Sequence, residues 1–175
     1  MKILSVEKTY KAHVFDVAKV LSELPDGRQR YYDLVQHGPG VVLVPVTADG
    51  KIIFVSQYRL GSEKELLELP AGMINEHEDP DPAAARELRE ETGYESKDLI
   101  RLGGFYASAG YCSEYLYIYL ARDMVWNPLP QDDDEFLSNI TMTVDEVYEM
   151  VENGRLEDAK TIAALMMAQK YIRKG

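Results

Sequence analysis

The segment 72-GMINEHEDPDPAAARELREETGY-94 crowds carboxylates and arginines beside two prolines and a run of alanines. Asp81 and Pro82 predict a helix start, because aspartate caps a first turn and proline suits the first helical position. The alanines favour helix, and Gly93 is placed to end it. The sequence therefore predicts a helix over about 82–92, with a loop on each side.

The carboxylates of this helix are spaced so that several share one face. Glu87 and Glu91 are four positions apart and point the same way, and Glu90 lies beside them. Arg86 and Glu90 are also four apart and can pair, while Glu78 in the preceding loop can fold back towards the same face. Two interpretations stay open at this point. One is a solvated, charge-rich helix, and the other is a set of oxygens for a hard cation such as Mg²⁺.

The spacing across the stretch follows the pattern G-x5-E-x7-R-E-U-x-E-E-x-G-U, where U is a bulky apolar residue. The residues that meet its fixed positions are Gly72, Glu78, Arg86, Glu87, Leu88, Glu90, Glu91 and Gly93. This arrangement resembles the Nudix box, with Tyr94 in a final slot where an aliphatic residue is commoner. An EF-hand fits less well, because its D-x-D-x-D-G loop is absent.

The resemblance implies both a fold and a chemistry. Nudix proteins have an α/β/α sandwich around a mixed sheet and cleave a nucleoside diphosphate linked to another moiety. The implied metal ligands are Glu87 and Glu91, with Glu90 beside them and the backbone carbonyl of Ala71 added. Arg86 resembles the family's orienting residue. The implied cofactor is Mg²⁺, with Mn²⁺ as the alternative, because water attacks a negative diphosphate only when cations polarise it.

The flanking sequence resembles the ADP-ribose pyrophosphatase branch over nearly the whole chain. The matching pieces are 24-LPDG-27, 57-QYR-59, 68-ELPAG-72 and 158-DAKTIAAL-165. In that branch an N-terminal meander is exchanged between two subunits, so the resemblance implies a homodimer.

Substrate-binding residues follow from the same branch. Arg59 matches a phosphate-contacting arginine, with a surface ion pair as the alternative. Glu68 matches a residue near the terminal ribose. Tyr32 is a candidate for stacking on a base, with a structural role as the alternative.

Two loops bear on specificity and on water activation. The branch has S-P-G where this chain has 108-SAG-110, so Ala109 departs from the pattern while Gly110 keeps it, and other nucleoside diphosphate sugars become candidate substrates. In 132-DDDEF-136, Glu135 is an implied metal ligand, and Asp133 stands where the branch has its water-activating glutamate. Glu135 or Glu114 could activate the water instead, because Asp133 is one methylene shorter. The alternative for this loop is an ordinary acidic turn. The resemblance also makes Ala109, Gly110 and Glu114 candidate substrate-binding residues.

The net charge and the cysteine content of the chain limit the kinds of partner and of cellular setting that we expect. The chain has 175 residues and a formal net charge of -11, which argues against nucleic acid as the main partner. A single cysteine, Cys112, excludes an intrachain disulfide and favours a cytoplasmic setting. We expect no signal peptide and no membrane-spanning segment.

The remaining pattern predicts an α+β fold. Residues 1–38 form an expected N-terminal antiparallel β meander for dimerisation, and residues 39–175 form the expected Nudix hydrolase domain. Further expectations are a hairpin of strands 41–47 and 51–58 around Asp49-Gly50, strands near 99–106, 114–121 and 137–142, and helices over about 144–152 and 158–173.

The sequence therefore predicts a metal-dependent pyrophosphohydrolase acting on ADP-ribose or a related nucleoside diphosphate sugar. Two alternatives remain, which are a nucleoside triphosphate pyrophosphohydrolase and a non-hydrolysing sensor that binds ADP-ribose.

Overall fold

The computed structural model describes residues 1–131 and 136–173. The chain forms two compact units, one made of Met1–Pro39 with Phe105–Leu116 and the other of Gly40–Gly104 with Tyr117–Gly175. No helix within the described residues is long and apolar enough to cross a membrane.

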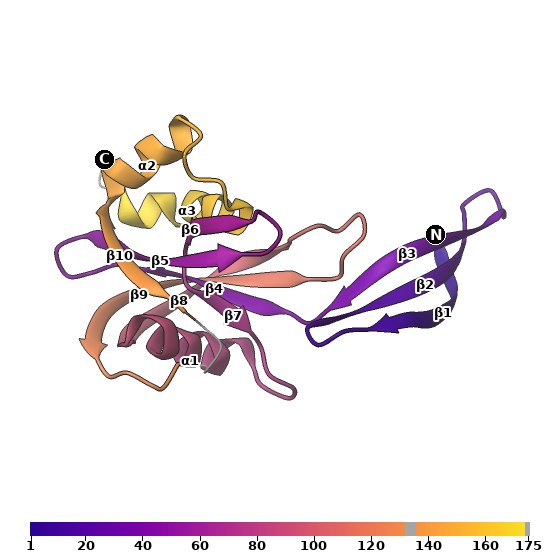
Figure 1. The fold of residues 1–175 in the computed structure, drawn as a ribbon, viewed down its shortest axis with the longest axis horizontal. Coiled ribbons are helices and arrows are strands. Elements are labelled where there is room, and N and C mark those ends of the chain that lie inside the picture. The colour runs from indigo at the N-terminus through magenta and orange to yellow at the C-terminus, as the bar shows by residue number, and fades with distance from the viewer. Residues whose placement is uncertain (132–135, 174–175) are drawn as a thin grey trace. The chain divides into compact units, whose positions relative to one another are not determined.

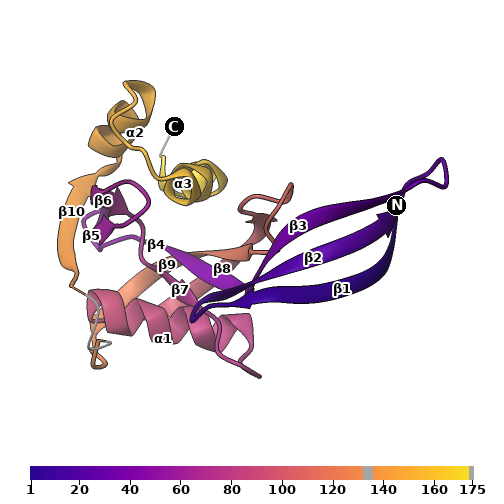
Figure 2. The ribbon, with the colours of Figure 1, turned by 45° about the vertical axis from the view of Figure 1, so that its right-hand side comes forward.

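The smaller unit contains an antiparallel sheet of three strands in the order β1-β2-β3, which Figure 2 shows side by side. The strands are β1 (Lys2–Lys11), β2 (Phe15–Glu23) and β3 (Gln29–His37). Gly27 allows the β2–β3 turn, because its φ of 84° lies in the left-handed region. The expected antiparallel meander is confirmed.

The larger unit has two sheets among its described residues (Figure 1). One has the order β7-β4-β9-β8 and the other the order β10-β5-β6. The strands are β4 (Gly40–Pro45), β5 (Lys51–Arg59), β6 (Lys64–Glu68), β7 (Ala71–Met73), β8 (Tyr94–Tyr106), β9 (Tyr115–Trp126) and β10 (Ser138–Thr143).

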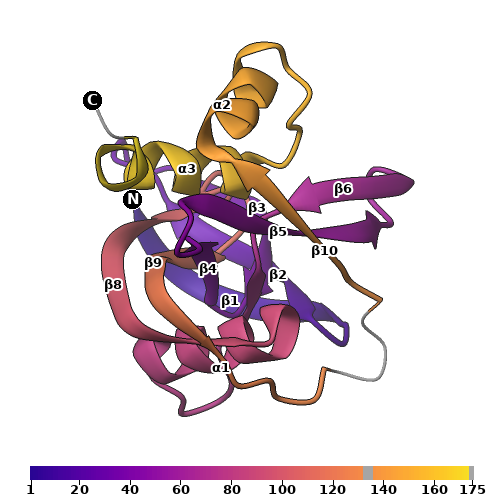
Figure 3. The same ribbon diagram turned by 90° about the vertical axis from the view of Figure 1, so that its left-hand side faces the viewer.

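Helices cover these sheets on two sides. Figure 3 shows α1 (Pro80–Thr92) on one side, and α2 (Val144–Glu152) and α3 (Ala159–Ile172) on the other. Both α1 and α3 contact β4, and all six residues of β4 are buried. A strand covered on both faces needs a continuous apolar run, which explains the sequence VVLV. The expected α+β fold with helices on both sides of the sheets is confirmed.

The hairpin predicted over 41–58 is wrong in one respect. Its turn is present, with Gly50 at a φ of 79°, but β4 and β5 belong to different sheets, and the bridge between Val46 and Ile52 lies just beyond the end of β4. Because β4 is paired on both edges, by β7 and β9, β5 pairs with β6 and β10 instead.

The predicted start of α1 is also shifted. The helix begins at Pro80 with Asp79 as its N-cap residue, two positions before the expected start. Asp81 does not cap the helix, because its Oδ1 accepts hydrogen bonds from the Tyr119 hydroxyl at 2.5 Å and from Arg101 at 2.6 Å. Gly93 ends the helix as expected, with a φ of 79°.

Candidate active site

Arg86 gathers the acidic side chains of the box into one cluster. Its Nη1 donates to Glu87 at 2.7 Å and to Glu90 at 2.8 Å, and its Nε and Nη2 donate to the two oxygens of Glu78. Nη2 also donates to the Met73 carbonyl at 3.0 Å. The pairs expected from the spacing are therefore present. Glu78 above all, followed by Glu87 and Glu90, raises the pKa of Arg86 far above its usual value, so the guanidinium is a permanent cation.

Two further contacts bring Glu87 and Glu91 against the first residue of the box and the residue before it. The Glu87 carboxylate lies so close to Gly72 that a Cβ there would be 2.0 Å from its Cδ. Glu91 accepts a hydrogen bond from the Ala71 N–H at 3.1 Å. Both glutamates are buried, with exposed fractions of 8% and 3%. The structure therefore brings Ala71, Glu87 and Glu91 together.

The donor set suits a hard divalent cation. All of its candidate ligands are oxygens, and Mg²⁺ is usually held by one or two carboxylates while water and substrate phosphates complete its shell. Across residues 1–131 and 136–173, no three acidic, histidine or cysteine side chains are arranged to hold a metal by themselves. Glu87 and Glu91 thus fit a cation that shares its shell with water and substrate. Asp133 and Glu135 lie outside the described residues.

Arg59 and Glu68 are also brought together. Arg59 Nε and Nη2 donate to the two Glu68 oxygens at 2.8 and 2.7 Å, and Lys160 Nζ contacts Glu68 Oε2. Burial alone would raise the pKa of Glu68, but the hydrogen bond from Arg59 and the charge of Lys160 outweigh it and leave the pKa below its usual value. Glu68 is 1% exposed, so its carboxylate is engaged with these cations rather than open to solvent.

The segment 68–71 is held from both helical layers. On the α3 side, Leu69 N–H donates to Thr161 Oγ1 at 2.8 Å, and on the α1 side, Ala71 N–H donates to Glu91. Sequence reasoning missed Lys160 and Thr161 as part of this site. The segment 158-DAKTIAAL-165 matches the branch, but this match alone predicts no role for either residue.

Four of the expected substrate-binding residues belong to the smaller unit. Tyr32 and Gly110 line the same hollow of about 250 Å³, together with apolar residues of β1 and β2. The Arg30 guanidinium lies 5.5 Å from the Tyr32 ring centre. Glu114 lies 3.7 Å from His37 Nδ1.

Ala109 occupies a tight turn that is closed without proline. Tyr111 N–H donates to the Ser108 carbonyl at 3.1 Å, and Cys112 N–H donates to the same carbonyl at 2.9 Å. Ala109 is therefore the second residue of the turn. Because Gly110 is not among the glycines with positive φ, the turn has type I character, in which proline is favoured at the position of Ala109.

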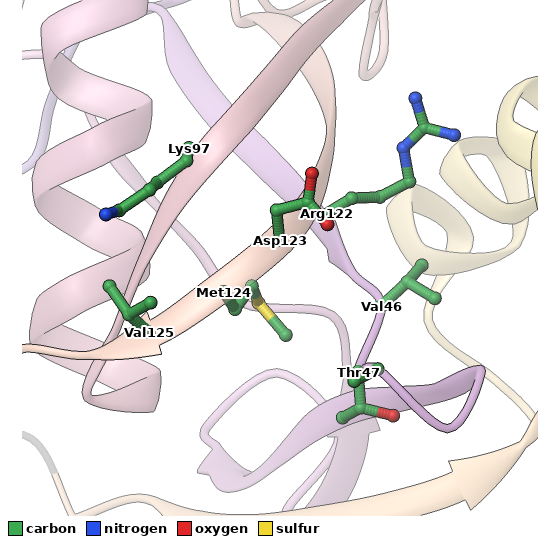
Figure 4. A pocket seen from close by; sticks show the side chains of 8 residues that line it. Val46, Thr47, Lys97, Arg122, Asp123, Met124 and Val125 are labelled. Carbon is green, nitrogen blue, oxygen red and sulfur yellow. The ribbon is translucent and has the colours of Figure 1, made fainter.

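A larger hollow, of about 480 Å³, lies elsewhere in the larger unit and is lined by residues of β8, β9 and the turn after β4. Figure 4 shows the Lys97 and Arg122 side chains pointing away from each other around apolar Val46, Met124 and Val125. Arg122 is already paired with Asp98 at 2.7 Å. A ligand site needs polar groups that converge, so this hollow is a weaker candidate than the box.

Comparison with known proteins agrees with this geometry. The NUDIX domain family matches residues 36–165. An ADP-ribose pyrophosphatase of Bacillus subtilis is 34% identical over 96% of this chain and 92% of its own length, and a methanol dehydrogenase activator of Bacillus methanolicus has the same identity and coverage. The crystal structure of an ADP compounds hydrolase aligns with a TM-score of 0.86 at 27% identity, covering 98% of this chain and 94% of that one. The chain therefore belongs to the NUDIX domain family.

Proposed function

We propose that this protein is a metal-dependent pyrophosphohydrolase that cleaves the diphosphate of ADP-ribose or a related nucleoside diphosphate sugar. The products are a nucleoside monophosphate and a sugar phosphate. The observation that carries the proposal is the unbroken box on α1, in a chain related over 96% of its length to an ADP-ribose pyrophosphatase.

The charged residues of the box on α1 have roles in this proposal. Glu87, Glu91 and the Ala71 carbonyl hold Mg²⁺ or Mn²⁺, and the bound cation neutralises the diphosphate and lowers the pKa of the attacking water. Arg86 keeps Glu87 and Glu90 oriented through its hydrogen bonds to both.

The other candidates bind substrate or activate water. Arg59 binds a phosphate from the position that Glu68 gives it. Asp133, Glu135 or Glu114 takes the proton of the attacking water, and Glu135 also joins the metal ligands.

Residues of the smaller unit are assigned to the nucleoside and sugar. Tyr32 stacks on the base, while Ala109 and Gly110 lie in a loop that binds the substrate.

The test is a substrate panel with Mg²⁺, containing ADP-ribose, other nucleoside diphosphate sugars and nucleoside triphosphates, with products separated by chromatography. Wild type is expected to give AMP and ribose 5-phosphate from ADP-ribose. Glu91→Gln should keep the fold and lose at least about 100-fold in kcat, because a buried ligand is lost. Glu76→Gln is the matched control, since Glu76 lies in the same stretch with a side chain 90% exposed. Near-normal turnover by Glu91→Gln would refute the metal-site assignment.

The two alternatives give different results in the same panel. Release of pyrophosphate from triphosphates, with no cleavage of ADP-ribose, would favour the triphosphate pyrophosphohydrolase. Tight binding of ADP-ribose without turnover, in either Mg²⁺ or Mn²⁺, would favour the sensor.

We also propose that the meander of residues 1–38 forms a homodimer interface. Every residue of β1 is exposed, including Ile3, Val6 and Tyr10 on a sheet edge, and an exposed apolar edge strand favours pairing with another chain. Val6→Lys should convert a dimer to a monomer in light scattering, whereas Glu7→Lys at the adjacent position should not. A wild-type protein that is already monomeric would refute the interface.

A cytoplasmic location belongs to the same proposal. It is supported by Cys112 being the single cysteine of the chain.

A further inference from the structure

Glu68 is a buried carboxylate shared between two cations from different layers of the larger unit. Arg59 comes from the end of β5 and engages both carboxylate oxygens, and Lys160 comes from the first turn of α3 and contacts Oε2. With 1% of its surface exposed, Glu68 has little room to touch a ligand directly. Glu68 can therefore influence a ligand only through the positions of Arg59 and Lys160.

Arg59 keeps part of its surface and several of its donors outside this pair. A guanidinium has five N–H donors, and the two bonds to Glu68 leave the remaining donors available. The Arg59 side chain is 41% exposed. The hydrogen bonds to Glu68 are the main reason that the pKa of Arg59 is raised, and Glu68 lies three residues before Ala71, whose N–H donates to the candidate metal ligand Glu91. Arg59 is thus oriented by Glu68 and open to an anion beside the box.

Lys160 is more enclosed and more fully occupied. Its side chain is 19% exposed, and besides Glu68 it contacts Asp158 Oδ2 at 3.0 Å. Asp158 is itself fixed, because it caps α3 by accepting a hydrogen bond from Thr161 N–H at 3.0 Å. Lys160 is therefore held at a set position relative to Glu68 by the start of the helix.

We propose that Lys160 is a positioning residue that acts on substrate through Glu68 and Arg59. Lys160 neutralises part of the negative charge of Glu68. The positive charge of the Arg59 guanidinium is therefore less compensated by Glu68 and can attract a substrate phosphate. Without Lys160, Arg59 alone must neutralise a desolvated carboxylate. Because attraction between charges is strong in a poorly solvated site, the Arg59 guanidinium would then be held closer to Glu68 and farther from the substrate phosphate. This inference rests on the proposed function, because the phosphate belongs to the diphosphate substrate.

The expected signature is a change in substrate binding rather than in chemistry. Lys160→Met should raise KM for ADP-ribose about tenfold and leave kcat within about twofold, because the metal ligands and the box are untouched. Lys160→Arg should restore most of the binding, since it returns a cation to Glu68. Lys64→Met is the matched control, because Lys64 pairs with Glu157 at a half-exposed position of the same unit.

A double-mutant cycle with Arg59→Met separates positioning from direct contact. If Lys160 acts through Arg59, then Lys160→Met should have little further effect on KM in the Arg59→Met background. Additive losses would mean that Lys160 contacts substrate itself, and this result would overturn the proposal. A lower melting temperature of Lys160→Met with an unchanged KM would also overturn it, by reducing Lys160 to a structural role.

Calorimetry with α,β-methylene ADP-ribose, a non-hydrolysable probe, distinguishes failure of the proposed function from failure of the proposed role of Lys160. If wild type neither cleaves any nucleoside diphosphate sugar of the panel nor binds the probe, the proposed function fails. If wild type binds the probe and Lys160→Met binds it equally well, only the role of Lys160 fails. The supporting result is weaker binding of the probe by Lys160→Met and recovery by Lys160→Arg.

Discussion

Replacement of Gly72 by alanine tests the geometry of the box most directly. The new Cβ would stand 2.0 Å from Glu87 Cδ and 2.2 Å from both carboxylate oxygens. Ordinary contact begins at 3.4 Å, so the carboxyl carbon must retreat by about 1.4 Å. The backbone itself does not resist the change, because Gly72 has no positive φ. The effect therefore falls on the position of Glu87.

The size of the effect differs between stability and activity. Moving Glu87 off its rotamer costs about 0.5–1.5 kcal/mol, while replacing glycine where alanine is allowed returns about 0.4–1 kcal/mol through the unfolded chain. The melting temperature should therefore change by only a few degrees. A displacement of about 1 Å in a catalytic group can cost about 100-fold in rate. We expect kcat to fall by about that factor, with a higher Mg²⁺ concentration needed for half-maximal activity.

The assay is ADP-ribose turnover across a Mg²⁺ titration, paired with thermal unfolding of the metal-free protein. Gly61→Ala is the matched control, because a Cβ at Gly61 meets nothing within 4 Å and its φ is not positive. It should behave as wild type in both measurements. If Gly72→Ala also kept wild-type turnover and Mg²⁺ dependence, Glu87 could not be a ligand held by this close approach, and the reasoning would be refuted.

Three further predictions concern local features. Ala109→Pro should raise stability by about 0.4–1 kcal/mol in thermal unfolding without reordering the substrate panel, and a changed order would make the missing proline a specificity element. Tyr119→Phe should lower the free energy of unfolding in urea by about 1.5 kcal/mol, because its hydroxyl donates to Asp81, and an unchanged midpoint would contradict that bond. Arg86 lowers the pKa of Glu78, so the stability from this pair is present above the usual value of 4.5 and is lost as pH falls. Below that pH, the melting temperature of Glu78→Gln should therefore fall less steeply with decreasing pH than that of wild type. An equally steep fall in both proteins would argue against the pair.

The parts of the fold and site that the sequence predicted are those set by contacts close along the chain. Arg86 and Glu90 pair because they are one helical turn apart, and Gly93 ends α1 because it adopts a φ that other residues resist. The same reasoning could not choose between Asp79-Pro80 and Asp81-Pro82, since both dipeptides satisfy the rules for a helix start. The choice is made by Tyr119 and Arg101, which bind the Asp81 carboxylate from strands of the sheet.

Long-range pairing explains the remaining misses. An Asp-Gly turn between two apolar runs predicts a hairpin, but it cannot tell that β4 is paired on both edges by β7 and β9. Lys160 carries no local pattern that marks it as part of a site. Its partner Glu68 lies 92 positions away, and only the packing of α3 brings the two together.

The segment 68–71 shows why the box by itself does not make a site. Its Leu69 N–H is tied to Thr161 at the start of α3, and its Ala71 N–H is tied to Glu91 near the end of α1. Glu68, at the same segment, orients Arg59 through two hydrogen bonds. The carboxylates proposed for metal binding and the arginine proposed for phosphate binding therefore depend on one short extended stretch. A change at Thr161 should reach the box through this stretch, although α3 carries none of the box residues.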